Sequence, residues 1–476
     1  MSWNRREVLG GLGVASAQAL LWAFGCSHPA RPVRHALGEV SSEIRALLHE
    51  AVETLAGAGL TAHALAVSRL RSTAAIDVLG GGVAHARCDG VVLTVQQPKG
   101  TREQVTSALS RDGVMAAVRA LATRSGTGRV DFGPAPRPAR APSPDPDTIT
   151  DQALLDSVAD IARRDTVQSS RIVYAAGMID IDDSMLWSVA ANRDLEQRLY
   201  RVRRSLTRVA WNGTRPIVSE VSRAWTGGIN DQLFDDAEIA YAREVALALM
   251  TPTAFPDGEH ALVLAPNVVA GVIDAAVRSL LTTTAALRPE VAQRLAVGAT
   301  VASPVLTLVD DPTTAGAYGG FEFDDAGQLA STMPLLDKGH VVGRVARGRR
   351  PGHVGPIEPA SSHLRLAPGT VKELPLDDGF WLEGTSQNAI VDPASDRVVI
   401  AVQRALEIKH GKRTGRVFAD VEVVGDLGPL LASITHATTE TQTVGIRDEV
   451  DGLPRWRSIE APFLLGKGLV RSRRPR

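Results

Sequence analysis

The sequence predicts an α+β protein: an N-terminal domain of helices and antiparallel strands over residues 38–250, then a mainly antiparallel β domain over residues 255–476. Three observations support this architecture. A chain of 476 residues is long enough for two domains. In the first half, apolar residues recur at helical spacing in several segments, with short strand-like runs between them. From Gly258 onward, nearly all the periodic segments have strand character.

The N-terminal domain opens with a predicted helix over residues 41–56. Ile44, Leu48 and Val52 fall on one helical stripe, and Gly57 would end the helix. The elements expected next are strands at 63–69, 75–79 and 91–96, turns at Gly80–Gly82 and Asp89–Gly90, and a helix at 101–122.

Residues 133–147, GPAPRPARAPSPDPD, are Pro-rich and of low complexity. Such a segment is typically extended, so we expect a surface connection rather than part of the core. The elements expected after it are helices at 151–162 and 235–249 and strands at 171–181, 186–191 and 206–211.

The C-terminal domain begins with a predicted strand over residues 260–264 and a helix for which Asn267 is the expected N-cap. The apolar residues at helical spacing are Val269, Ile273, Ala276, Val277 and Leu280. Asp274 and Arg278 lie four apart on another face, a spacing that suits a surface ion pair. The β elements expected later are a strand at 305–309 and a hairpin of strands 397–408 and 415–424 around a His410–Lys412 turn.

Composition favours a soluble globular protein that does not bind nucleic acid. Hydrophobic residues make up 44% of the chain and the formal net charge is −1. Nucleic-acid-binding proteins typically carry a basic surface and aromatic side chains that stack on bases. With only 4% aromatic residues and balanced charge, we expect no nucleic-acid partner.

The first 26 residues are typical of a twin-arginine export signal. Arg5 and Arg6 precede an apolar stretch that is too short and too Gly-rich for a membrane-spanning helix. The sequence AFGC that ends at Cys26 resembles a lipoprotein cleavage box. We therefore expect lipidation of Cys26 and a membrane anchor facing the periplasm; the alternative is a signal whose Cys is incidental. A lipidated Cys26 leaves only Cys88, and no intrachain disulfide.

Other polar motifs are predicted to be structural. His49 and Glu50 imitate the start of a zinc-binding helix, but no second His follows on that face, so a surface helix is favoured. His340, His353 and His363 stand at irregular gaps in Gly- and Pro-rich sequence and are expected in loops in contact with water. Paired carboxylates occur at Asp182–Asp183, Asp235–Asp236, Asp310–Asp311, Asp324–Asp325 and Asp377–Asp378. Most lie near a Pro, a Gly or a helix start, where Asp favours turns and caps.

Several segments of the second half occur in an order that resembles one known family. They are Ala270–Ile273, Asp310–Pro312, Phe323–Gly327, Leu335–Gly339, Asp377–Asp392 and Pro454–Ile459. In this order they resemble the TldD/PmbA family, also called modulators of DNA gyrase. In that family a zinc peptidase subunit, TldD, pairs with a subunit, TldE or PmbA, that has no metal site. The resemblance implies the fold of that family.

In TldD-type members the helix that begins with this Ala-Gly-Val sequence continues as H-E-x-x-x-H and supplies the metal ligands. At the His, Glu and His positions this chain has Ala275, Ala276 and Leu280 without a gap, or Asp274, Ala275 and Ser279 in the register one back. Zinc needs two imidazoles facing one way and a Glu that takes a proton from the bound water. Neither register supplies them, and no Cys follows Cys88. We therefore expect no catalytic residue, metal ligand or cofactor in this chain.

The resemblance thus implies a non-catalytic, TldE-like subunit. Such a subunit helps to enclose and hold unfolded peptides for a TldD-like catalytic partner, which would supply the zinc. Two alternatives stay open, a stand-alone exported lipoprotein that binds peptides and an independent metallopeptidase. A cytoplasmic location, as for most of the family, is the alternative to export.

Overall fold

The computed structural model describes residues 37–77, 80–97, 100–123, 150–163, 171–213, 216–250, 253–345, 361–385, 389–392, 394–450 and 453–472. The expected export signal with Arg5, Arg6 and Cys26, the Pro-rich segment 133–147 and His353 lie outside the described residues. Within the described residues, no helix is both long enough and apolar enough to cross a membrane.

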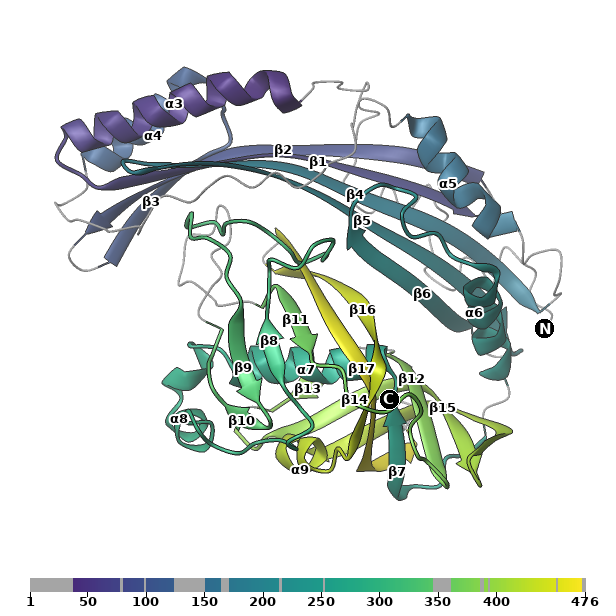
Figure 1. The fold of residues 1–476 in the computed structure, drawn as a ribbon. Coiled ribbons are helices and arrows are strands. Elements are labelled where there is room, and N and C mark those ends of the chain that lie inside the picture. The colour runs from purple at the N-terminus through teal and green to yellow at the C-terminus, as the bar shows by residue number, and fades with distance from the viewer. Residues whose placement is uncertain are drawn as a thin grey trace.

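The N-terminal half forms a six-stranded antiparallel sheet in the order β3-β2-β1-β4-β5-β6. Its strands are β1 (Ala62–Asp77), β2 (Gly80–Gln97), β3 (Gly100–Thr106), β4 (Ile172–Ala190), β5 (Arg193–Trp211) and β6 (Pro216–Thr226). Figure 1 shows this sheet arching over the C-terminal half. Helices cover its outer face, at one end α3 (Leu37–Gly57) and α4 (Arg111–Ala122), at the other α5 (Asp151–Arg163) and α6 (Asp236–Ala248).

Alternation along the strands gives this sheet an apolar and a polar face. Ala62, Ala64 and Ala66 of β1 pack in one apolar cluster with Ile44 and Leu48 of α3, as the helical stripe predicted. By the same alternation and the strand register, the opposite face of β1, β4 and β5 carries Arg69, Arg71, Asp180, Asp182, Arg201 and Arg203. This polar face is the concave side of the arch, which faces the C-terminal half.

The structure confirms the predicted helices at 41–56, 151–162 and 235–249. Other predictions are wrong. The predicted strands 63–69 and 75–79 are parts of one strand, β1, and the predicted strands 171–181 and 186–191 are parts of β4. Asp89–Gly90 is not a turn but lies inside β2, paired with Ser68 and Val67. Residues 101–106 do not begin a helix, because they form β3 against β2, and the helix α4 starts only at Arg111. Pairing with a long neighbouring strand overrides the local turn and helix signals in both places.

The C-terminal half forms a large mixed sheet in the order β10-β9-β8-β11-β17-β15-β14-β12-β7. Its strands, with the flanking β13 and β16, are β7 (Gly258–Leu264), β8 (Leu308–Asp310), β9 (Met333–Asp337), β10 (His340–Val341), β11 (His363–Leu366), β12 (Gly379–Thr385), β13 (Ile390–Val391), β14 (Arg397–Lys409), β15 (Lys412–Asp426), β16 (His436–Val450) and β17 (Leu453–Ser472). Because β17 also pairs with β7, five strands close into a barrel. Most pairings are antiparallel, which confirms the predicted fold class, but β11 runs parallel to β17 and β12 parallel to β7.

Local details of this half confirm one turn and correct one cap. His410 and Gly411 take φ values of 50° and 68° between β14 and β15, which confirms the predicted hairpin. Asn267 is not an N-cap, because the helix α7 (Pro266–Leu280) begins at Pro266 and its N-cap is Ala265. Pro suits the first helical position because its missing N–H would have no partner there. The Asn267 side chain instead accepts a hydrogen bond from the N–H of Gly384.

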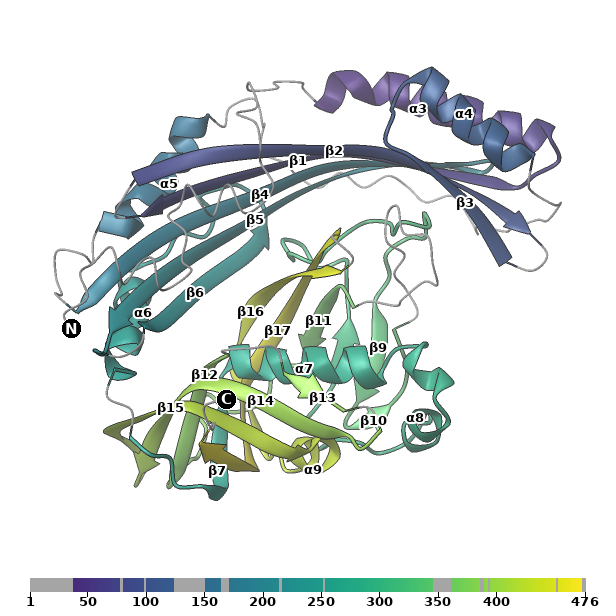
Figure 2. The same cartoon turned by 180° about the vertical axis from the view of Figure 1, so that it is seen from behind.

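The two halves contact each other beneath the arch. Arg201 and Gln197 of β5 donate hydrogen bonds to the carbonyls of Tyr318 and Phe323, at 2.9 and 2.7 Å. Arg193 of the same strand donates to a carbonyl farther along this connection. The hairpin of β16 and β17 also rises from the C-terminal half toward the underside of the sheet (Figure 2).

Candidate functional site

The helix α7 crosses the middle of the C-terminal half and carries the positions of the expected metal motif (Figure 1). Most of its side chains pack into the main apolar core with residues of β12, β14 and β17. The residues of α7 that are not buried are Asn267, Gly271, Arg278 and Ser279. Because nearly every side of the helix is covered, its polar residues have fixed surroundings.

The motif positions lie in contrasting surroundings. Ala275, Ala276 and Leu280 are at most 5% exposed and belong to the apolar core. In the register one back, Asp274 is buried as well, while Ser279 is half-buried. The first register therefore contains only apolar side chains among apolar neighbours, and the second contains a single carboxylate.

Asp274 forms ion pairs with two arginines. Arg278 Nε lies 2.9 Å from Asp274 Oδ2, and Arg457 Nη1 of β17 contacts Oδ1. The Asp274 and Arg457 side chains are only 5% and 4% exposed. The structure thus confirms the predicted pair with Arg278, but its expected position at the surface is wrong, because the second arginine and the core enclose the carboxylate.

These residues do not fit a zinc ion. Burial lowers the pKa of Arg457 to about 10, which leaves the guanidinium charged at neutral pH. A metal ion at Asp274 would therefore meet two cations that already occupy both carboxylate oxygens. The sequence of α7 contains no His and no Glu that could ligate the ion or take a proton from its water. The arrangement can hold a buried ion cluster, not a catalytic metal.

A second polar cluster lies where β8, β11 and β17 meet. His363 Nδ1 lies 2.8 Å from Ser458 Oγ, to which the N–H of Gly319 donates a hydrogen bond of 3.1 Å. Asp310 accepts hydrogen bonds from the backbone N–H groups of Ser362 and His363. His363 is 1% exposed, so its expected place in a loop in contact with water is wrong. Burial lowers the pKa of His363, which keeps the imidazole neutral in this junction.

Asp311, the second residue of the predicted turn, is fixed by several donors. Thr313 and Thr332 donate to its Oδ1, at 2.6 and 3.1 Å from their hydroxyls, and Arg365 Nη1 lies 2.9 Å from its Oδ2. Burial alone would raise the pKa of Asp311, but these hydrogen bonds outweigh it and lower the pKa to about 2. The carboxylate thus organises a turn, as predicted, and is poorly suited to accept a proton.

Two other carboxylate pairs also have structural roles. Asp235 caps α6, and its carboxylate accepts the N–H of Glu238 at 2.8 Å, which confirms the predicted cap. Asp182 and Asp183 point to opposite faces of β4, where they pair with Arg69 and Arg198. Because neighbouring residues of a strand face opposite ways, this pair cannot share a proton.

Trp456 of the β16–β17 hairpin joins the two halves through an arginine clamp. The guanidinium carbons of Arg69 and Arg201 lie 4.5 and 4.6 Å from its ring centroid. Arg69 Nε lies 2.5 Å from Asp182 Oδ2, and Arg201 Nε donates a hydrogen bond to the carbonyl of Tyr318. Both arginines are therefore oriented by other groups, and the indole contacts side chains that are already fixed. Trp456 is therefore an anchor of the contact between the two halves.

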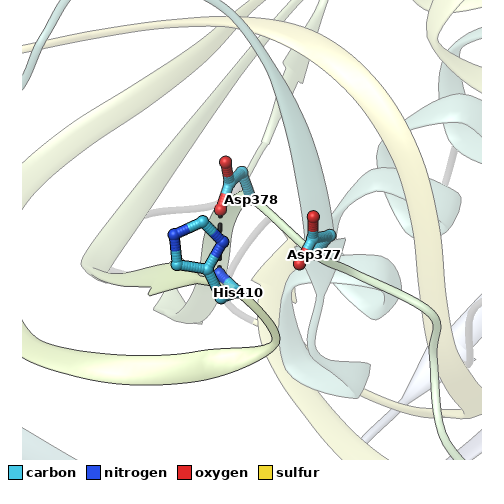
Figure 3. A group of neighbouring side chains, drawn as sticks. All are labelled: Asp377, Asp378 and His410. Atoms are coloured by element: carbon cyan, nitrogen blue, oxygen red, sulfur yellow. Dashed lines mark hydrogen bonds between the residues drawn. The ribbon is translucent and has the colours of Figure 1, made fainter.

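Other groups with histidine lie at the surface. Asp377, Asp378 and His410 are the group of described residues whose side chains could approach one cation, near the β14–β15 turn (Figure 3). All three are exposed, and Asp378 Oδ1 already accepts the N–H of His410. His49 on α3 is 41% exposed, which confirms the predicted surface helix. His340 is exposed as expected, although it belongs to the short strand β10.

Comparison with known proteins identifies the C-terminal half. Residues 257–469 match the family model described as the PmbA/TldA metallopeptidase C-terminal domain. The C-terminal half therefore carries the C-terminal domain of the TldD/PmbA family. A metalloprotease of Methanocaldococcus jannaschii is 25% identical over 236 residues, which cover 45% of this chain and 52% of that protein. The chain therefore aligns with about half the length of this curated relative.

Solved structures show that the TldD/PmbA fold extends over both halves. A protein described as a modulator of DNA gyrase from Bacteroides thetaiotaomicron has a TM-score of 0.70 and 15% identity, with 91% of this chain and 100% of that chain covered. A second modulator from Thermotoga maritima has a TM-score of 0.73 and 14% identity, at 91% and 100% coverage. TldE from Thermococcus kodakarensis has a TM-score of 0.73 and 14% identity, at 90% and 100% coverage. At such low identity these likenesses show the fold alone.

Within this TldD/PmbA domain, sequence reasoning located α7 but missed Arg457. A signal was present in the alternation of β17. Arg457, Ile459 and Ala461 share the face that packs on the core, and the latter two belong to the apolar cluster. A charged residue at an inward position requires a partner, and Asp274 is the only carboxylate in the sequence of α7.

Proposed function

We propose that this chain is a TldE-like, non-catalytic subunit of a TldD-type zinc metallopeptidase complex. The observation that carries the proposal is the state of α7, the helix on which the resemblance places the metal motif. Its only carboxylate is already paired with Arg278 and Arg457. The chain keeps the domain of a metallopeptidase family without a donor set for the metal.

What the chain offers to a peptide is the backbone of its strand edges. Strands β3 and β6 form the two edges of the arched sheet, and part of the β6 edge is bonded to Gly316 and Gln403 of the C-terminal half. An extended, unfolded peptide can add to such an edge through main-chain hydrogen bonds. The charged residues of the concave face between them, such as Asp180, Asp182 and Arg201, are at most 6% exposed, so we assign peptide binding to the strand edges.

The partner in this proposal is a TldD-like subunit that carries the zinc ion and the Glu base. The substrate is an unfolded peptide, enclosed between the two subunits and cut by the partner. The twin-arginine signal and Cys26 extend the proposal to a location outside the cytoplasm, with the complex anchored to a membrane by lipid and facing the periplasm.

The test is co-expression of the full chain with a TldD-type relative that has the H-E-x-x-x-H sequence, followed by affinity purification and metal analysis. We expect the two chains to co-purify, with zinc bound by the relative and peptide cleavage faster in the complex. Recovery of this chain alone from cells that express both would favour the stand-alone peptide-binding lipoprotein. About one zinc per isolated chain, with chelator-sensitive cleavage, would favour an independent peptidase.

Localisation is tested separately. The variant with Arg5→Lys and Arg6→Lys keeps the positive charge of the signal but removes the twin arginine. We expect the unchanged chain in the membrane fraction, labelled by a fatty-acid probe, and the variant in the cytoplasm. A Cys26→Ser variant is the matched control for lipidation. Cytoplasmic recovery of the unchanged chain would leave the subunit proposal intact and refute export.

A further inference from the structure

The pair formed by Arg457 and Asp274 is unusual in its position. Arg457 is 3% exposed and lies on the face of β17 that packs against the core, beside Ile459 and Ala461. Its side chain reaches across to α7 and contacts the buried carboxylate there. A guanidinium inside an apolar core is costly unless it is paired, because its hydration is lost. The cost of burying this guanidinium therefore has to be offset by a specific interaction in the core.

We infer that Arg457 is a built-in cation that pairs with Asp274 on α7 and keeps a divalent metal ion away from this point of the helix. Two observations support this. Arg457 meets α7 at Asp274, which is the first ligand position of the H-E-x-x-x-H motif in the register one back. Its guanidinium contacts one oxygen of that carboxylate, while Arg278 takes the other. All three residues of the cluster belong to this chain, so its charges do not depend on whether a TldD-type partner binds.

The local charges explain how this pairing keeps a metal away. Two guanidinium groups lie against the oxygens of one carboxylate, and both repel a divalent ion that approaches those oxygens. The two arginines are not equivalent. The Arg278 side chain is 36% exposed and can interact with water, whereas that of Arg457 is 4% exposed and depends on its neighbours in the core. Arg457 is therefore the buried cation of the cluster, and Arg278 is a surface neighbour.

The first test is a double-mutant cycle on thermal unfolding. We expect Arg457→Met and Asp274→Asn each to lower the Tm by about 5–15 °C, because each leaves a buried charge without its main partner. The double variant should lose clearly less than the sum of the two. Arg278→Met is the matched control, with a loss of no more than about 3 °C. Additive losses, or equal losses for the two arginine variants, would overturn the inference.

The second test asks whether the guanidinium blocks a metal. The variant with Asp274→His and Ser279→His places imidazoles at the two His positions of the motif, and it is compared with the same variant carrying Arg457→Met. We expect Zn²⁺ to bind at least about tenfold more tightly when Arg457 is absent, measured by isothermal titration with zinc sulfate alone. Circular dichroism at 25 °C confirms that both variants are folded. Equal affinity in the two proteins, or no binding in either, would show that the guanidinium of Arg457 does not keep the metal away and would overturn the inference.

Discussion

Removal of the indole of Trp456 should loosen the contact between the arched sheet and the C-terminal half. The ring lies within 4.6 Å of the guanidinium carbons of Arg69 and Arg201. A cation–π contact contributes about 0.5–1 kcal/mol when exposed and about 2 kcal/mol or more when desolvated. The two contacts, with loss of the packed ring, give an expected cost of about 2–4 kcal/mol for Trp456→Ala.

Scanning calorimetry measures this effect. For a domain of about 200 residues, such a cost corresponds to a decrease of about 5–10 °C in the Tm of the N-terminal half. We expect the two halves of Trp456→Ala to unfold in separate transitions. The Tm of the N-terminal half in Trp456→Phe should lie between that of Trp456→Ala and that of the unchanged chain, because a smaller ring keeps a weaker contact. The double variant Arg69→Met with Trp456→Ala should have a Tm only slightly below that of either single variant, because both changes remove the same contact.

The control for this prediction is Trp381→Ala. Trp381 belongs to β12 of the barrel, where its ring contacts Phe463 and Arg413, both of the C-terminal half. Its removal should destabilise that half without separating it from the arched sheet. If Trp456→Ala leaves the Tm of the N-terminal half unchanged within about 1 °C, or if Trp381→Ala has the same effect on it, the clamp does not couple the two halves.

Three further predictions concern single residues. Asp235→Ala should lower the free energy of unfolding by about 1 kcal/mol, measured in urea, because it removes the capping box of α6. Gly319→Ala should cost roughly 1–3 kcal/mol, because a Cβ there would lie 2.0 Å from the carbonyl of Ser362; Gly428→Ala, with no atom within 4 Å, is the control and should be neutral or stabilising. The pKa of Asp311 is lowered from 3.8 to about 2, so its contribution to stability, about 1–2 kcal/mol, is present above pH 4 and is lost as the pH falls toward 2. The free energy of unfolding of Asp311→Asn, followed by acid titration, should lack that part of the pH dependence, and an unchanged acid transition would contradict this.

Local signals in the sequence predicted the helices and the β14–β15 hairpin. The stripe through Ile44 and Leu48, the cap at Asp235 and the turn at His410 each depend on residues close in sequence, and the structure confirms all three. Asp89–Gly90 failed as a turn because its conformation is set by pairing with β1, about twenty residues away. Sequence reasoning could not weigh a tertiary pairing against a local turn preference.

The candidate site also separates features that local sequence predicts from features that depend on residues far away in the chain. The sequence of α7 alone shows that a metal-binding motif is missing, because ligand types are a local property. The partner of the buried Asp274 carboxylate is Arg457, which is 183 residues away along the chain. Likewise, the burial of His363 follows from its pairing with Ser458 across two strands, which its Pro- and Gly-rich surroundings did not reveal.

A short stretch of β17 connects these features through the alternation of its side chains. Trp456 and Ser458 lie on one face, where the first reaches the arginine clamp of the arched sheet and the second bonds His363. Arg457 lies on the other face, against Asp274. A shift of β17 by one residue would exchange the two faces and disrupt all three contacts at once. The ion cluster on α7 and the position of the arched sheet therefore both depend on the register of β17, because neighbouring residues of this one strand make the contacts of each.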